Sequence, residues 1–274
     1  MKRIVVFALL LMLLAPCARA EGASFEGEGY AAPEDAALAY AEAFARGDVM
    51  GMVSTFAVET YVEHFDAKAY LLDRQGYSTH YADPLLAIPL ETGYGQALRV
   101  TDRVSGILDS FDQQYAAMSG MVDLENEYMN PNMGRVAFRP DQPEILEEFL
   151  EAAAACVWPG EVTAGQVLGR DLSGSVQWGD SYDKYLATVC AYAGCDEAVT
   201  VAPLLRIDGV DYLQLMVCVR YGETWYNFAL SGWLGSYLLV AVPEFRNYRN
   251  ACGLLPAGPA LALLEQNGID QEVK

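Results

Sequence analysis

Hydrophobic residues in the first half of the chain recur at helical spacing. From Pro33 onward, apolar side chains return every three or four residues, and two acidic residues follow Pro33, where a helix N-terminus favours negative charge. Gly47 is suited to end this helix, and the Asp48 side chain can cap a second one. The same spacing predicts further helices over residues 61–72, 98–119, 141–155 and 178–193, with a loop over residues 76–97.

The last third of the chain shows the alternating pattern of β-strands. Asp208-Gly209 predicts a tight hairpin turn, because both central positions of a type I′ turn need a positive φ. Residues 221–224 give a second turn, so the strands form an antiparallel meander. Pro203 cannot donate a hydrogen bond to a ladder, which predicts that its strand lies at an edge or contains a bulge.

Two-residue turns fix the register of this meander. The register pairs apolar residues of neighbouring strands, namely Val219 with Tyr226, Val217 with Phe228, Leu215 with Leu230, and Leu213 with Leu204. One face of the sheet is then continuously apolar, and we expect the earlier helices to cover it. The other face carries Gln214, Met216, Cys218, Arg220, Trp225 and Asn227.

Helices followed by an antiparallel meander define an α+β fold. We expect N-terminal helices that pack on a curved C-terminal sheet. Residues 33–255 form a single domain in this interpretation, and residues 256–274 form a C-terminal tail with a short apolar helix.

The first two predicted helices resemble those of a known fold family. Tyr40, Phe44, Gly47-Asp48 and Phe56-Ala57 resemble the first two helices of nuclear-transport-factor-two-like, or cystatin-like, cone folds. Residues 221–230 are similar to the terminal hairpins of secreted bacterial members. The resemblance implies a pocket between the curved sheet and the helices. It implies no particular activity, because such folds include enzymes, binders and transport adaptors.

Residues 1–20 have the pattern of a signal peptide. Lys2 and Arg3 precede an uninterrupted apolar run over residues 4–14, and Ala18-Arg19-Ala20 offers small residues at the two positions that signal peptidase reads. The run is shorter than the roughly 20 residues that cross a bilayer, and no later segment is long enough. The sequence therefore predicts a secreted or extracellular protein without a transmembrane span.

Cys17 offers an alternative location. Leu14-Ala15-Pro16-Cys17 resembles the lipid-attachment box of bacterial lipoproteins, in which the cysteine is acylated. Because that box needs a small residue where Pro16 stands, we favour cleavage after Ala20 over a lipid anchor at the outer cell surface. Residues 21–32 then form a leader, which we expect to be loose.

Composition narrows the classes of partner. The chain has 274 residues, with 17 Lys and Arg against 37 Asp and Glu, and a formal net charge of −20. Nucleic-acid binding needs clustered basic residues, so we expect no nucleic-acid partner. The sequence contains no phosphate-binding loop, zinc-ligand spacing or calcium loop, so we expect neither a cofactor nor a metal.

Five of the six cysteines remain once Cys17 is removed, and an odd number leaves at least one free thiol. Cys190 and Cys195 bracket the segment Ala191–Gly194, which can turn, and they are the best local pair for a disulfide. Their spacing is not the C-x-x-C of thiol oxidoreductases. Cys218 lies in an apolar strand pattern and is expected to be a small buried side chain.

Two histidines are the candidates for catalysis. His64 lies near Asp66 and His80 near Asp83, and a histidine with a carboxylate can act as general acid or base. Isomerases and dehydratases of the cone fold use such a pair in their pocket. Because charged surface segments show the same pattern, we assign no catalytic residue and keep a pocket enzyme as the alternative.

Aromatic residues are abundant, with 17 Tyr, 10 Phe and 4 Trp. Exposed aromatic side chains bind sugars and peptides in extracellular modules, so Tyr61, Tyr77 and Trp225 are candidates for ligand contact. Core packing explains most aromatic residues in so apolar a chain. The sequence thus predicts an exported, non-catalytic ligand-binding or interaction domain whose partner is a small molecule, a glycan or a peptide.

Overall fold

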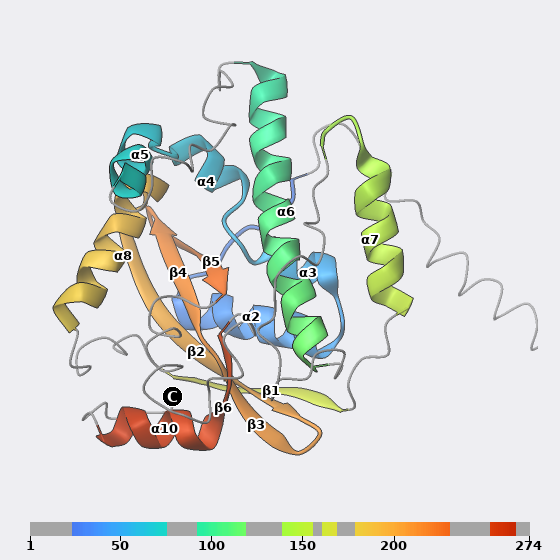
Figure 1. Cartoon of the computed structure of the whole chain (residues 1–274), viewed down its shortest axis with the longest axis vertical. Coiled ribbons are helices and arrows are strands. Elements are labelled where there is room, and N and C mark those ends of the chain that lie inside the picture. The colour runs from blue at the N-terminus through green and yellow to red at the C-terminus, as the bar shows by residue number, and fades with distance from the viewer. Residues whose placement is uncertain are drawn as a thin grey trace, which may run out of the picture.

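The structure, a computed structural model, describes residues 24–75, 92–118, 139–155, 161–168, 179–230 and 253–266. The helices are α2 (Pro33–Ala45), α3 (Val49–Ser54), α4 (Glu59–His64), α5 (Ala67–Gln75), α6 (Gly93–Met118), α7 (Pro143–Ala155), α8 (Gly179–Ala193) and α10 (Ala257–Gln266). The strands are β1 (Val162–Leu168), β2 (Glu197–Ile207), β3 (Val210–Gln214), β4 (Met216–Tyr221), β5 (Thr224–Leu230) and β6 (Leu254–Pro256) (Figure 1). This is the α+β fold that the sequence predicts. The expected signal peptide and Cys17 lie outside the described residues.

Local capping sets the boundaries of the first helices. Pro33 occupies the first turn of α2, and Gly47 follows its end with a φ of 65°. The Asp48 carboxylate accepts the backbone N–H of Gly51 at 2.8 Å and so caps α3. The predicted boundary between these two helices is therefore confirmed.

The helix predicted over residues 61–72 is two helices, α4 and α5. The chain breaks after His64 because Asp66 Oδ1 accepts the N–H groups of Lys68 and Ala69, at 2.8 and 2.9 Å, and starts a new helix. Sequence spacing did not reveal this break, because the apolar stripe continues across it.

Strand β2 is the centre of the sheet. It pairs with β4 and β3 along one edge and with β1 along the other, while β5 extends the sheet from β4 and β6 extends it from β3. Asp208 and Gly209 join β2 to β3 with φ values of 49° and 81°, which confirms the predicted turn.

The predicted register holds near the turns and fails further away. Leu204 pairs with Leu213, and Val219 pairs with Tyr226, as expected. A register shift between Val217 and Cys218 then changes the later partners. The predicted pairs of Val217 with Phe228 and of Leu215 with Leu230 are wrong, because Val217 pairs with Ala229 and Leu230 with Met216.

Strand β1 was not predicted, since the short segment Val162–Leu168 contains Gly165 and lacks a clear alternation. Its pairing with β2 shifts register between Ala164 and Val167, where Val167 meets Pro203. The extra residue lies in β1, and β2 is paired along both of its edges. The prediction that the strand of Pro203 lies at an edge or contains a bulge is therefore wrong.

Helices cover both faces of the sheet (Figure 1). On the face that carries Met216, Cys218 and Trp225, helices α2, α3 and α6 complete the largest hydrophobic cluster. Of the earlier helices, which we expected on the opposite face, α2, α3 and α6 lie on this face instead, whereas α8 lies on the opposite face as expected.

The opposite face packs mainly on α8 and α10. Val217 and Val219 contact the cluster that contains Val189 of α8, while Leu215 lies in the cluster of Leu264 from α10. Helix α10 lies within the segment that the sequence suggests as a C-terminal tail, and its Leu264 is 1% exposed.

The leader is tied to the domain within residues 24–32, whereas a loose segment was expected. Tyr30 and Trp225 exchange backbone hydrogen bonds of 3.0 and 2.8 Å at the edge of β5. The Glu26 carboxylate accepts the N–H of Val58 at 2.5 Å and that of Thr60 at 3.1 Å, at the start of α4. The Thr60 hydroxyl also donates to Glu26.

Replacing Glu26 by alanine should destabilise the fold by about 2 kcal/mol, because three donors at the start of α4 lose their acceptor. The thermal midpoint should fall by roughly 4–8 °C in a chain of this size. Glu28→Ala is the matched control, since Glu28 is exposed. Equal midpoints for the two variants would show that the leader is not held by this carboxylate.

Candidate functional site

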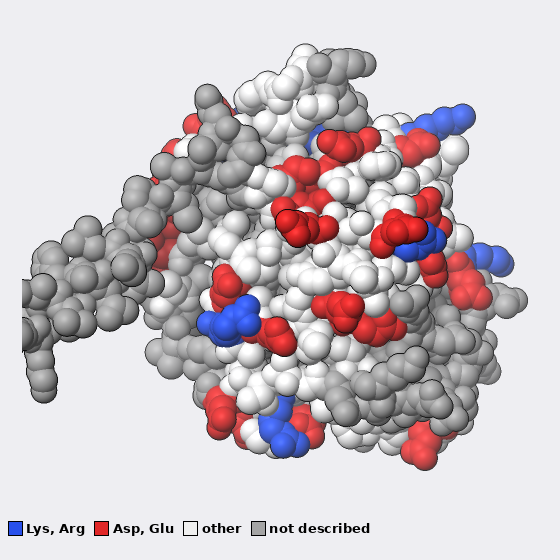
Figure 2. Space-filling view, turned by 180° about the vertical axis from the view of Figure 1, so that it is seen from behind, with Lys and Arg blue, Asp and Glu red and all other residues white. Residues whose placement is uncertain are grey.

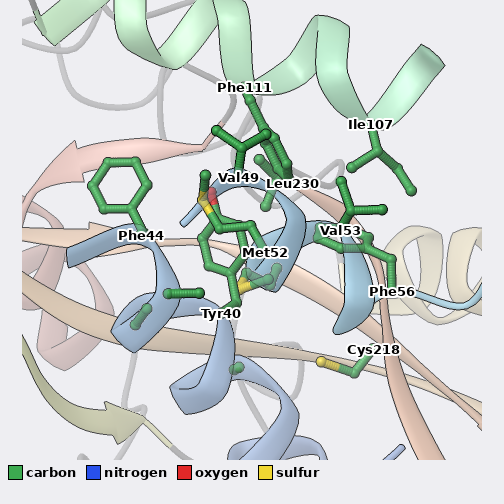
Figure 3. Close-up of a cluster of buried hydrophobic side chains, with 14 of the residues drawn as sticks. Tyr40, Phe44, Val49, Met52, Val53, Phe56, Ile107, Phe111, Cys218 and Leu230 are labelled. Atoms are coloured by element: carbon green, nitrogen blue, oxygen red, sulfur yellow. The ribbon is translucent and has the colours of Figure 1, made fainter. Parts of the chain in front are cut away.

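Large side chains fill the described part of the space between the sheet and helices α2, α3 and α6. Tyr40, Phe44, Phe56 and Phe111 are at most 1% exposed. The ring centroid of Tyr40 lies 5.9 Å from those of Phe56 and Phe111. Figure 3 shows these rings packed together with Met52. They occupy a region in which the cone-fold resemblance implies a pocket.

Buried polar side chains connect the helices to the sheet within this core. Gln114 of α6 accepts a hydrogen bond from the Tyr40 hydroxyl at 2.7 Å and donates one to Gln214 of β3. Asn227 of β5 donates to the Thr55 hydroxyl at 2.9 Å. Because buried polar atoms are costly unless paired, these contacts hold the helices at fixed positions on the sheet.

A second group of aromatic side chains lies between α4, α5, α8 and β5. We call it the aromatic cluster, and its members are Tyr61, Phe65, Tyr70, Tyr192 and Phe228. Each ring contacts two others, so that the five form a closed circuit with centroid separations between 5.4 and 6.1 Å. Phe228 is buried and the other four are half-buried. Four residues of the cluster are therefore partly accessible to solvent, while Phe228 is packed inside the protein.

Arg103 of α6 occupies the inner side of the aromatic cluster. Its guanidinium carbon lies 4.9 Å from the ring centroid of Tyr61 and 4.6 Å from that of Phe228. Arg103 Nε donates to the carbonyl of Ala57 at 3.1 Å, and Nη2 donates to the carbonyl of Phe228 at 2.6 Å. The side chain thus links α6 both to the chain before α4 and to β5.

Arg99, one helical turn earlier, lies 5.3 Å over the ring of Phe65. A cation over an aromatic face is attracted by the ring quadrupole, so both arginines stabilise the stacked arrangement. Burial lowers the pKa of Arg103, and nearby tyrosine side chains act in the opposite direction. The Arg103 guanidinium lies against the rings of Tyr61 and Phe228, so a ligand would contact the accessible parts of the four half-buried residues.

The structure places one predicted ligand-contact residue, Tyr61, in this cluster. Trp225 is 3% exposed and packs in the core on the α2 side of the sheet. Tyr77 lies outside the described residues. The two candidates that the structure describes therefore lie in different hydrophobic clusters.

His64 and Asp66, the described members of the catalytic candidates, lie at the edge of the same region. His64 is exposed, its Nδ1 is 2.9 Å from the carbonyl oxygen of Thr60, and its ring centroid is 4.9 Å from that of Tyr221. The Asp66 carboxylate caps α5. His80 and Asp83 lie outside the described residues.

Sequence reasoning did not identify the other members of the cluster or Arg103. The only local signal was spacing: Tyr61 and Phe65 lie four residues apart, as do Arg99 and Arg103. Nothing in the sequence shows that the two aromatic residues face the two arginines. These contacts join α4, α6, α8 and β5, which are distant from one another in the chain.

Within the described ranges, no group of three or more His, Cys, Asp or Glu side chains could hold a metal ion. Of the helices that the structure describes, none is long and apolar enough to cross a membrane. Figure 2 shows acidic side chains spread over the described part of one face, among fewer basic ones.

Comparisons with known proteins give one match, to a solved structure. It is a cystatin-like protein from Ruminococcus gnavus ATCC 29149, with a TM-score of 0.43 and 10% sequence identity over 71% of this chain. The match covers 39% of the length of that protein. No family model matches the sequence, and no curated protein matches it. At this identity and TM-score the likeness defines neither a family nor a function.

Proposed function

We propose that this chain is an exported, non-catalytic domain that binds a ligand or partner at the aromatic cluster. The observation that supports this proposal is the closed circuit of aromatic rings, four of which are half-buried. Tyrosine side chains offer a large, rigid contact area together with a hydroxyl group, and they lose little conformational entropy on binding. The underlying arginines keep the rings in place before a ligand arrives.

The chemistry of the cluster suits a small molecule, a glycan or a peptide. Sugar and apolar side chains can pack on ring edges and faces, while tyrosine hydroxyls supply hydrogen bonds. The net charge of −20 disfavours a nucleic acid. The signal-peptide pattern of residues 1–20 supports secretion, with a lipid anchor at Cys17 as the alternative.

We favour binding over the isomerase or dehydratase alternative. That alternative needs a histidine with an available carboxylate in an enclosed site. Of the described candidates, His64 is exposed and Asp66 uses its carboxylate to cap a helix.

The proposal predicts that a ligand found by thermal-shift screening binds at least about tenfold more weakly to Tyr70→Ala, since aromatic anchors carry much of a binding energy. The screen should contain oligosaccharides, peptides and small apolar molecules, and calorimetry should then measure the affinity. Tyr94→Ala is the matched control, because Tyr94 is 54% exposed and lies on α6 outside the cluster. Equal affinities for the two variants, or no stabilisation by any class of ligand, would contradict the proposal.

A further inference from the structure

The Arg103 guanidinium is a cation without a carboxylate partner among the residues that the structure describes. Its hydrogen bonds in these ranges both go to uncharged backbone carbonyls, those of Ala57 and Phe228. None of the ion pairs among the described residues includes Arg103. Because a charge removed from water is costly unless an opposite charge offsets it, Arg103 has the capacity to bind an anion.

One side of this guanidinium is available to a ligand. A guanidinium carries five N–H donors, and the Nε and Nη2 atoms already donate to the two carbonyls. Nη1 makes no hydrogen bond within the described ranges, and it is not one of the buried, unpaired side-chain atoms there, so it reaches solvent. Arg103 as a whole is half-buried. The two oxygens of a carboxylate match the spacing of neighbouring guanidinium N–H groups, which makes a carboxylate a suitable anion for this side.

The acidic surface of the protein does not cancel this positive charge. Of the described carboxylates, that of Glu26 acts on Arg103, and it already accepts three donors at the start of α4. Arg99 adds a second positive charge to the aromatic cluster, over the ring of Phe65. Salt screens exposed charges beyond about 8 Å at physiological ionic strength, so distant acidic residues act weakly here. The net charge of −20 still repels a polyanion and so favours a ligand with a single carboxylate.

Tyrosine side chains lie beside the available donors. The Arg103 guanidinium carbon is 4.9 Å from the ring centroid of Tyr61 and 4.6 Å from that of Phe228. The ring of Tyr192 contacts Phe228 from α8, with 6.1 Å between the centroids. Tyr61 and Tyr192 are both half-buried, so a ring attached to the bound carboxylate would pack on their accessible parts.

We propose that Arg103, Tyr61 and Tyr192 form a binding site for a small carboxylic acid that carries a ring. This inference rests on the proposed function and specifies the ligand class of the aromatic cluster. The carboxylate accepts hydrogen bonds from the Nη1 side of Arg103, while the ring packs on the tyrosines. The ring is that of a sugar acid or an apolar one, because tyrosine side chains accept both.

The experiment measures the affinity of the purified full chain for two acids and for their uncharged counterparts, by titration followed with NMR. Glucuronate is compared with glucose, and phenylpropionate is compared with phenylpropionamide. At least one acid should bind about tenfold more tightly than its counterpart, since only the acid forms charge-assisted hydrogen bonds to Arg103. The pair that shows this preference identifies the kind of ring.

Arg103→Lys separates direct contact with the ligand from a general effect on the rings. Lysine keeps the positive charge but lacks the planar fork, so the preference for the acid should fall below about threefold. Tyr70→Ala should weaken an acid and its counterpart by the same factor and leave the preference intact. Arg206→Lys changes a surface ion pair with Asp211, and as the matched control it should keep the wild-type preference.

Equal affinities for each acid and its counterpart would overturn the inference, and so would the absence of binding by either acid up to about 10 mM. Both results come from the wild-type protein and do not depend on the folding of a variant. An unchanged preference in folded Arg103→Lys would also overturn it. Binding of an uncharged ligand that Tyr70→Ala weakens would still support the proposed function, so the two failures are distinguishable.

Discussion

Replacing Asn227 by aspartate is expected to lower the free energy of unfolding by about 4 kcal/mol at neutral pH. Asn227 is 0% exposed, and its Nδ2 group donates to the carbonyl of Ala36 at 2.8 Å and to the hydroxyl of Thr55 at 2.9 Å. Aspartate has nearly the same shape, but it offers an acceptor where these two oxygens need a donor. It also carries a charge into a site whose described side-chain hydrogen-bond partners, Cys218, Ala36 and Thr55, are all uncharged.

Thermal or urea unfolding measures this effect, and a fall in midpoint of roughly 10 °C is expected. Burial should raise the pKa of the new carboxyl above its unfolded value of about 3.9, so the deficit should be small below that pH and grow as the pH rises through it. Gln142→Glu makes the same change of amide to acid at an exposed position and is the matched control. A loss no greater than that of the control would show that Asn227 does not anchor α2 and α3 to β5.

Replacing Arg103 by methionine should cost about 3 kcal/mol of stability. Methionine keeps most of the side-chain length but removes both charge-assisted hydrogen bonds, to the carbonyls of Ala57 and Phe228. It also removes the cation from between the rings of Tyr61 and Phe228. Guanidinium-chloride unfolding followed by tyrosine fluorescence should report both the lost stability and the loosened cluster.

Arg206→Met is the control for a general loss of positive charge. Arg206 forms a surface ion pair with Asp211, at 2.7 Å between Nε and Oδ1, and its side chain is 60% exposed. Solvent screens such a pair, so this variant should unfold close to the wild type. If Arg103→Met lowers the free energy of unfolding no more than Arg206→Met does, Arg103 does not hold α6 against β5.

The contacts of Arg103 connect the stability of the domain to the proposed function. Arg103 and the ring of Phe228 lie behind the half-buried rings of Tyr61 and Tyr192. The loss of Arg103 should therefore weaken binding through disorder of the rings. For this reason Tyr70, whose ring contacts Phe65 and Tyr192, is the better residue for testing ligand contact.

Cys190 and Cys195 adjoin this surface, since Tyr192 lies between them in the chain. The turn between them also contacts α4 through the carbonyl of His64. A disulfide between Cys190 and Cys195 would fix the end of α8 and with it one wall of the aromatic cluster. The disulfide between Cys190 and Cys195 that the sequence indicated stays a prediction, since both thiols are free in this structure.

The sequence predicted most helices and both hairpin turns because their determinants are local. Asp48 caps α3 through an N–H three residues away, and Asp208-Gly209 adopts the φ angles of its turn without help from other elements. The register near each turn follows from the turn itself. It fails beyond Val217, since a bulge depends on how the whole strand packs against its neighbours.

The sequence could not predict which helices cover which face of the sheet. Gln214 and Asn227 made one face look polar, yet both side chains are 0% exposed. Their hydrogen-bond partners are distant in the chain, since Gln114 lies in α6 and Thr55 follows the end of α3. A strand with helices on both faces loses the simple alternation of apolar and polar residues, and a buried amide with a partner cannot be told from an exposed one.

The sequence by itself determined the α+β class, the order of helices and meander, and the turns, because each rests on contacts within a few residues. Tertiary structure alone decided which helices cover which face, where the ladder bulges, and that Arg103 lies among rings from α4 and β5. Those features join residues that are far apart in the chain, such as Arg103 and Phe228, which are separated by 125 positions. No spacing rule encodes such pairs, since they form only when the folded chain brings distant segments into contact.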